Sequence, residues 1–119
     1  MSKRILVVDD EHAILFAYKR LLQLEGFNVD VCATYYCAIA MINGNNYDYV
    51  LSDIRLGDSD NIEGLDILKY VNENEPSIKV IIATGYGNEA TKEQALKMGV
   101  KHYFEKPVDT RKLLMLLKE

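Results

Sequence analysis

The chain has 119 residues, of which 49% are hydrophobic and 27% are charged, so it suits one globular domain and excludes a disordered segment. Its formal net charge of −4 and its interleaved acidic and basic residues exclude the basic surface that nucleic-acid binding requires. All apolar runs are shorter than the roughly 18 residues that span a bilayer, and none near Met1 resembles a signal peptide. We therefore expect a soluble, cytoplasmic protein.

Short apolar runs rich in β-branched residues alternate with helical patterns along the chain. In chain order we expect strand 4–8, a helix through 14–22 that ends at Gly26, strand 27–32, helix 34–43, strand 47–52, helix 63–74, strand 79–84, helix 88–98, strand 101–105 and a last helix capped by Asp109 or Thr110. The apolar pattern is weakest in 88–98, where Ala95 and Met98 are its main anchors.

Strands that alternate with helices in this way predict an α/β fold, a doubly wound five-stranded parallel sheet with five helices on its two faces. The runs "ILVV" and "VIIA" are continuously apolar, as strands buried on both faces should be. In such a sheet, ligands bind beyond the carboxyl ends of the strands. The residues that follow each strand are therefore the candidates for function.

Charged and hydroxyl side chains stand at four of these strand ends. Asp9 and Asp10 follow the first strand, Asp53 ends the third, Thr84 ends the fourth and Lys106 ends the fifth. Considered singly, each has an ordinary alternative, such as a helix N-cap for Asp10 or a turn for Lys106. Together they place three carboxylates, one hydroxyl and one ammonium group at the same edge of the sheet, which predicts a functional site.

Carboxylates a few ångströms apart cannot all stay ionised without compensating positive charge. Lys106 supplies one such charge, and a hard divalent cation would supply two more. Mg²⁺ suits the site best, because it binds through one or two carboxylates, keeps water ligands and accepts phosphate oxygens. Aspartate can itself accept a phosphoryl group, and Lys106 and Thr84 have the chemistry to stabilise that group in transfer.

With the motifs "ILVVDDE", "YDYVLSDI", "VIIATGYG" and "YFEKP", the sequence resembles the receiver (phosphoacceptor) domain of two-component response regulators over essentially its whole length. The resemblance implies a flavodoxin-like (CheY-like) sheet in the order 2-1-3-4-5. It also implies that Asp53 is the phosphoacceptor, that Thr84 follows the phosphoryl group and that Lys106 pairs with it.

The same resemblance implies a metal site, a switch and partners. Mg²⁺ would be bound by Asp9, Asp10, Asp53 and the backbone carbonyl of Arg55. Tyr103 would be the switch aromatic, and the Lys106–Pro107 peptide bond would be cis. The chain would be a signalling phosphoacceptor and not an enzyme, with self-catalysed phosphoryl transfer and slow autodephosphorylation. Its partner would be a sensor histidine kinase or phosphotransfer protein. A homodimer through the fourth helix, fifth strand and fifth helix is a further option. Neither nucleic acid nor a membrane is expected as a partner.

One stretch departs from the family pattern, which usually places Met-Pro shortly after the acceptor and a glycine further on. Here Leu56 and Gly57 stand in place of Met and Pro, and the matching glycine is Gly64, so the loop is about three residues longer. Its acidic residues are Asp58, Asp60 and Glu63. The loop is either a solvated surface segment or one that changes access to the phosphoryl group.

Other functions stay open at this point. A receiver-like module could bind partners without phosphorylation, although the complete set of strand-end residues argues against it. A phosphatase of the haloacid dehalogenase type would resemble Asp-x-Asp at its nucleophile, whereas Ile54 and Arg55 follow Asp53. A flavin carrier is disfavoured, because the acids after the first strand would repel a phosphate.

The two cysteines, Cys32 and Cys37, both lie in apolar stretches. We expect them to be reduced residues of the core, in preference to a disulfide or a metal site, which would need further ligands nearby. We also expect residues 1–119 to form one receiver domain, with no output domain in this chain.

Overall fold

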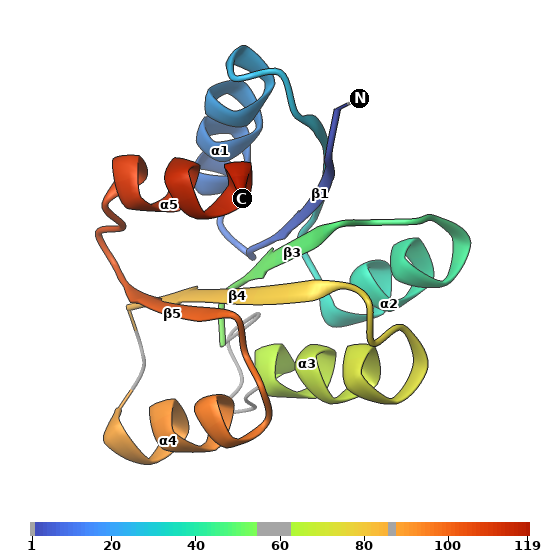
Figure 1. Cartoon of the computed structure of the whole chain (residues 1–119), viewed down its shortest axis with the longest axis vertical. Coiled ribbons are helices and arrows are strands. Elements are labelled where there is room, and N and C mark those ends of the chain that lie inside the picture. The colour runs from blue at the N-terminus through green and yellow to red at the C-terminus, as the bar shows by residue number, and fades with distance from the viewer. Residues whose placement is uncertain (1, 55–62, 86–87) are drawn as a thin grey trace.

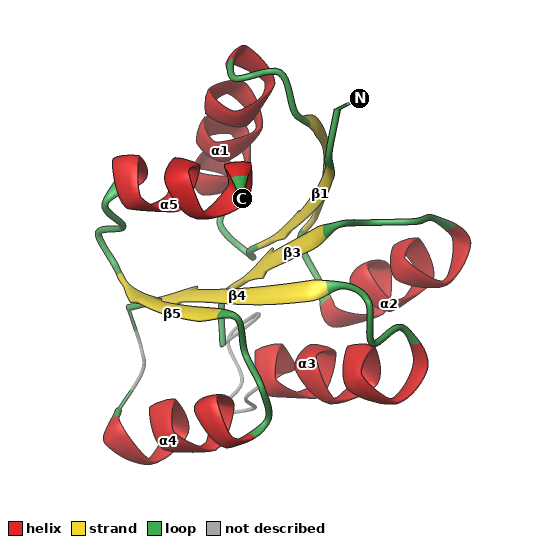
Figure 2. Cartoon of the chain, viewed as in Figure 1, coloured by secondary structure: helices red, strands yellow, loops and turns green. Residues whose placement is uncertain are grey.

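The computed structural model describes residues 2–54, 63–85 and 88–119. Ten elements alternate along the chain (Figures 1 and 2). They are β1 (Arg4–Val8), α1 (His12–Leu24), β2 (Asn28–Cys32), α2 (Tyr35–Gly44), β3 (Tyr49–Ser52), α3 (Glu63–Asn74), β4 (Lys79–Thr84), α4 (Glu89–Lys97), β5 (His102–Glu105) and α5 (Thr110–Lys118). Every predicted strand and helix is confirmed, with ends that differ by a few residues.

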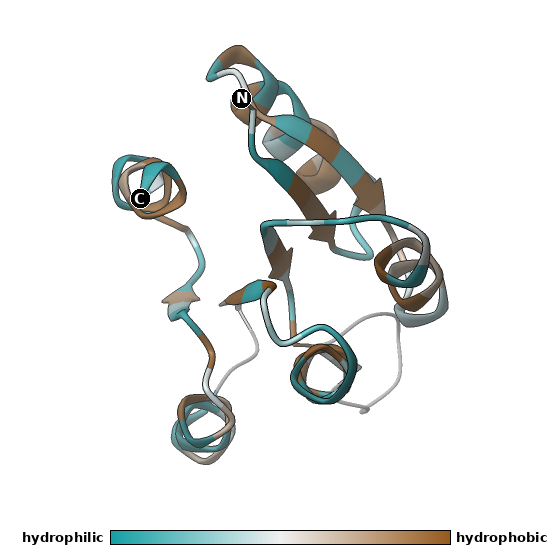
Figure 3. Cartoon of the chain, turned by 45° about the vertical axis from the view of Figure 1, so that its right-hand side comes forward, coloured by the Kyte–Doolittle hydropathy of each residue, from teal (hydrophilic) through white to brown (hydrophobic). Residues whose placement is uncertain are grey.

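The strands form one parallel sheet in the order β2-β1-β3-β4-β5, as predicted. Side chains alternate between its two faces along each strand. On β1, Ile5 and Val7 pack with α1 and α5, whereas Leu6 and Val8 pack with the helices of the other face. Figure 1 shows α1 and α5 on one side of the sheet and α2, α3 and α4 on the other. Figure 3 shows hydrophobic stretches in the strands, with helices on either side.

Short polar side chains and one glycine set several helix ends. The Asp109 carboxylate accepts hydrogen bonds from the Arg111 and Lys112 amides, so Asp109 is the N-cap of α5. Gly26 follows α1 with φ +92°, a conformation that glycine adopts without steric cost. At the other end of α1 the N-cap is Glu11, without a side-chain cap bond, so the alternative role of Asp10 as an N-cap is wrong.

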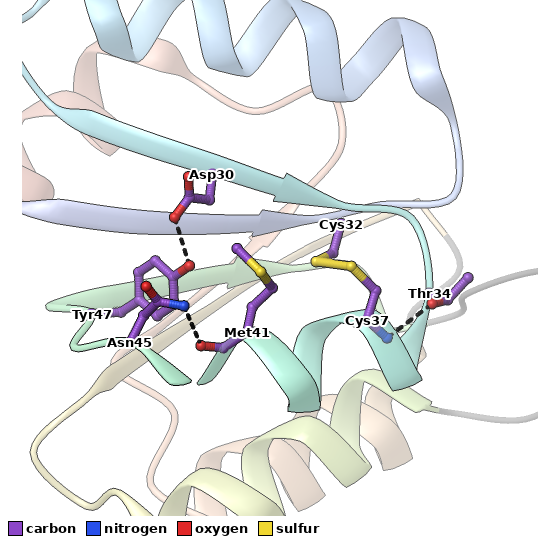
Figure 4. Close-up of a disulfide and its surroundings, with 7 residues drawn as sticks. All are labelled: Asp30, Cys32, Thr34, Cys37, Met41, Asn45 and Tyr47. Carbon is purple, nitrogen blue, oxygen red and sulfur yellow. Dashed lines mark hydrogen bonds between the residues drawn. A yellow bond between two sulfur atoms is a disulfide. The ribbon is translucent and has the colours of Figure 1, made fainter. Parts of the chain in front are cut away.

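The expectation that both cysteines are reduced core residues is wrong. Cys32 and Cys37 form a disulfide, which joins the end of β2 to the first turn of α2 (Figure 4). Cys32 is buried, as expected, but Cys37 is exposed. The short turn between strand and helix brings their Cα atoms to 5.7 Å, within the range for disulfides. An apolar pattern alone does not show that two elements meet so closely.

No helix in residues 2–54, 63–85 and 88–119 is long and apolar enough to cross a membrane.

Gly64, in the first turn of α3, packs directly against the end of β3. Its amide donates a 2.8 Å hydrogen bond to the Ile54 carbonyl. A Cβ atom at this position would overlap the Asp53 carbonyl oxygen and would lie only 2.6 Å from the Ile54 Cα. The backbone of α3 therefore approaches residues 53–54 so closely that only glycine fits.

We predict that Gly64→Ala lowers the free energy of unfolding by about 1–3 kcal/mol, because backbone atoms must shift to admit the methyl group. Gly44→Ala is the matched control, since a Cβ at Gly44 would meet no atom within 4 Å. In the last turn of α2, alanine should leave stability unchanged or raise it. Urea unfolding of both variants measures the difference, and equal stabilities would contradict the close approach at Gly64.

Candidate functional site

Backbone hydrogen bonds continue past the strands and hold the residues at their carboxyl ends in place. The Asp9 amide donates to the Cys32 carbonyl at 3.1 Å, and the Asp53 amide donates to the Val8 carbonyl at 3.1 Å. Between the ends of β4 and β5, the Lys106 amide donates to the Thr84 carbonyl at 3.0 Å. The side chains of Asp9, Asp53 and Lys106 therefore each start from a backbone position that a neighbouring strand fixes.

The Lys106 ammonium lies between two buried carboxylates. Its Nζ is 2.7 Å from Asp9 Oδ2 and 3.1 Å from Asp53 Oδ2. The side chains of Asp9 and Asp53 are 5% and 1% exposed, and that of Lys106 is 19% exposed, so solvent screens these pairs poorly. Asp9, Asp53 and Lys106 thus lie together as the sequence predicted. The Lys106–Pro107 bond is cis, also as expected.

Burial and ion pairing act in opposite directions on these groups. Burial raises the pKa of the Asp9 carboxyl, and the hydrogen bonds from Lys106 and the Glu11 amide only partly offset it. Burial alone would lower the pKa of Lys106, but its hydrogen bonds to Asp9 and Asp53 outweigh burial and raise that pKa. Lysine at this position is therefore held in its charged form by the two carboxylates.

A cluster of carboxylates lies beside this ion pair. Single oxygens of Asp9, Asp10 and Glu11 lie within 4.8 Å of one another. An all-oxygen donor set of this kind fits a hard cation such as Mg²⁺. Sequence reasoning had placed Asp53 and the Arg55 carbonyl in the metal site and had given Glu11 no role. Arg55 lies outside the described residues, as does the loop with Leu56, Gly57, Asp58 and Asp60.

Thr84 and Tyr103 come from neighbouring strands, β4 and β5. Thr84 is 1% exposed and ends β4 at the edge of the sheet where Asp53 lies. The Tyr103 ring packs against the core on the side of α2, α3 and α4. Its hydroxyl is buried and has no hydrogen-bond partner of good geometry among the described residues, although Thr91 lies nearby. Burial raises the pKa of this phenol.

An apolar groove of about 540 Å³ adjoins the site, between α1 and the connection from β5 to α5. Ile14, Tyr18 and Leu21 line it from α1, and Lys106 and Val108 line it from the other side. Sequence reasoning missed this groove. The signal available was the second set of apolar residues in α1, Ile14, Ala17 and Leu21, which recur at i, i+3 and i+7 beside the buried Leu15 and Leu22.

A family model for the response regulator receiver domain matches residues 5–118. An NtrX-like response regulator from Rickettsia typhi is 39% identical over 96% of the chain, and the photosynthetic apparatus regulatory protein RegA from Rhodobacter capsulatus is 32% identical over 91%. The chain spans 24% and 57% of the lengths of these two relatives.

Solved structures agree with the sequence comparison. A CheY-like receiver domain protein from Methanospirillum hungatei has a TM-score of 0.91 and 35% identity, covering 99% of this chain and 92% of its own. The response regulator TrrA from Thermotoga maritima, solved in complex with Mg²⁺ and BeF, has a TM-score of 0.84 and 29% identity, covering 98% and 96%. The chain therefore belongs to the receiver domain family of two-component response regulators.

Proposed function

We propose that the chain, acting as a single receiver domain over residues 1–119, accepts a phosphoryl group on Asp53 in a Mg²⁺-dependent reaction. The donor is a phosphohistidine of a sensor histidine kinase or phosphotransfer protein. The observation that carries this proposal is the Lys106 ammonium held between the buried carboxylates of Asp9 and Asp53. A buried acid next to a fixed cation, at the carboxyl edge of a parallel sheet, is suited to receive an anionic group.

In this proposal an Asp53 carboxylate oxygen attacks the phosphorus, the bond from phosphorus to the donor histidine nitrogen breaks, and an acyl phosphate forms. Lys106, already 3.1 Å from Asp53, pairs with the new phosphoryl oxygens. The Thr84 hydroxyl donates a hydrogen bond to another. Asp9, Asp10 and Asp53, with the Arg55 carbonyl, would hold Mg²⁺, which when bound supplies positive charge against the phosphoryl oxygens. The TrrA complex with Mg²⁺ and BeF supports this choice of ion.

The groove beside Lys106 suits the donor protein. It is apolar, and it is continuous with the site through Lys106, which lines both. An amphipathic helix that carries the phosphohistidine could bury its apolar face there. Such docking would place the histidine close to Asp53, which a solvent-exposed encounter would not do.

The alternative is a receiver-like module that binds partners without phosphorylation. It requires no chemistry at Asp53, so one experiment separates the two functions.

We predict that the protein incubated with acetyl phosphate and Mg²⁺ gains the mass of one phosphoryl group, and that Asp53→Asn does not. Intact-protein mass spectrometry measures this. A wild-type protein that never gains this mass would support the alternative, and a gain that survives in Asp53→Asn would place the acceptor elsewhere.

We predict that Mg²⁺ stabilises the folded chain, because the crowding of Asp9 and Asp10 exists only in the folded state. At a concentration tenfold above the dissociation constant, Mg²⁺ should add about 1.4 kcal/mol to the free energy of unfolding. Asp10→Asn should abolish most of this gain. Glu73→Gln, an exposed change of the same charge in the last turns of α3, is the matched control and should retain it. Equal responses of the two variants to millimolar Mg²⁺ would show that the cation does not bind at this site.

We propose further that the signal leaves the site through Thr84 and Tyr103. A phosphoryl group on Asp53 offers new acceptor oxygens to the Thr84 hydroxyl. Movement of that hydroxyl toward Asp53 leaves more space beneath α4, where the Tyr103 ring already packs against the core, so the ring can pack more deeply. Ala95 is the only residue of α4 that is buried, so this helix is weakly held and can reposition. The outer surface of α4, β5 and α5 would then favour partner binding or dimerisation, by a coupling of about 1–3 kcal/mol.

We predict that beryllofluoride shifts the amide resonances of residues 84–85 and 88–106 in the wild type. Thr84→Ala should still bind beryllofluoride at Asp53, but the resonances around Tyr103 should no longer respond. Tyr103→Phe removes a buried hydroxyl that has no hydrogen-bond partner of good geometry among the described residues, so it should stabilise the ring in its buried position and reduce the response without abolishing binding. Changes confined to the residues around Asp53 in the wild type would rule out this route.

A further inference from the structure

We propose that Cys32 and Cys37 form a reversible dithiol–disulfide couple whose oxidation state is transmitted to the backbone of Asp9. The redox chemistry stands independently of the proposed function, and only its effect on Mg²⁺ binding rests on that function. Three features carry the proposal: the pairing geometry, the unequal exposure of the two sulfurs, and the hydrogen bond that joins Cys32 to Asp9.

The fold itself brings the two cysteines together. Cys32 is the last residue of β2, Thr34 is the N-cap of α2, and Cys37 lies in the first turn of that helix. The Cys37 amide donates to Thr34 Oγ1 at 3.1 Å, so the cap fixes the position of Cys37 without help from the disulfide (Figure 4). The sulfurs therefore stay close after reduction, which is what reversible closure requires.

The two sulfurs have different environments. Cys32 is 3% exposed and packs in the core, whereas Cys37 is exposed to solvent. The first turn of a helix favours negative charge, and the thiolate is the form that reacts with an oxidant. Cys37 is therefore the sulfur that an oxidant or reductant reaches first, and Cys32 is the one that closes the bond.

Oxidation by a peroxide then proceeds in two balanced steps. The Cys37 thiolate attacks one peroxide oxygen, the O–O bond breaks, and the other oxygen leaves as water after taking a proton, so that Cys37 becomes a sulfenic acid. The Cys32 sulfur attacks the Cys37 sulfur, the S–O bond breaks, and a second water leaves with the Cys32 proton. The two thiols have lost two electrons and two protons. A dithiol reductant reverses the process by attacking Cys37, releasing Cys32, and closing its own disulfide.

The oxidation state of Cys32 and Cys37 affects the candidate site through one hydrogen bond. The Cys32 carbonyl accepts the Asp9 amide at 3.1 Å, directly beyond the paired residues Val8 and Cys32. The Asp9 carboxylate contacts the Glu11 amide at 3.0 Å and Lys106 at 2.7 Å. The disulfide ties the end of β2 to α2 and restrains the carbonyl that orients Asp9. Reduction releases this restraint, so Asp9 is held less firmly.

The experiment uses the full chain, fully reduced and then treated with hydrogen peroxide. Alkylation and intact mass should find two free thiols before treatment and none after, in a monomer, and dithiothreitol should restore both. In Cys32→Ala, dimedone should trap a sulfenic acid at Cys37. In Cys37→Ser, the buried Cys32 should stay unreacted until the protein is unfolded. Thiols that stay free in the treated wild type, or that link two chains, would overturn the proposal.

The second measurement compares ¹⁵N-labelled protein in its two oxidation states. The Asp9 amide resonance should move, whereas those of α5, on the other face of the sheet from α2, should not. The double variant Cys32→Ala/Cys37→Ser should not respond to peroxide at Asp9. Mg²⁺ should bind the oxidised form about threefold more tightly than the reduced form. An Asp9 resonance that is the same in both states would refute the coupling, while absence of Mg²⁺ binding in either state would count against the proposed function and not against the couple.

Discussion

The ion pair of Lys106 with Asp9 and Asp53 is the interaction on which the site depends. Two carboxylates at the end of a buried sheet would repel each other, and the ammonium group between them offsets that repulsion. Lys106 and Asp9 are 97 residues apart in sequence, so the pair forms only when β5 has docked onto the sheet. The burial that strengthens the attraction also makes any unpaired charge costly. The site is thus assembled by the fold and exists only in the folded chain.

The sequence was most informative about features that depend on the periodicity of hydrophobic residues and on the residues that follow each strand. Continuous apolar runs predicted strands buried on both faces, and the same logic placed Asp9, Asp53 and Lys106 at one edge, where they lie. The strand order 2-1-3-4-5 came from the family resemblance and not from the pattern, since alternating strands and helices allow other orders.

Features that depend on distance between elements could not be predicted. The Cys32–Cys37 bond needs the end of a strand and the first turn of a helix to meet, and hydrophobicity does not encode that separation. The groove beside α1 arises where two elements fail to close over each other. The buried Tyr103 hydroxyl likewise follows from how the ring packs, because a pattern shows only that tyrosine is partly apolar.

The carboxyl end of β1 is where the constraints of the molecule meet. Beyond Val8, the Asp9 amide binds the Cys32 carbonyl of β2, and the Val8 carbonyl itself accepts the Asp53 amide at the end of β3. A disturbance of β2 at this edge therefore reaches Asp9 within one hydrogen bond, and a disturbance at Asp53 reaches the same strand from the other side. Thr84 and Tyr103 lie further along the sheet, on β4 and β5, where α4 is held by little buried surface. The side chains of β1 are buried on both faces of the sheet, whereas α4 buries little surface. Structural changes that begin at the site should therefore be small in β1 and larger in α4. The same end of the sheet thus joins a strand, β1, whose side chains are buried on both faces to a helix, α4, that buries only Ala95.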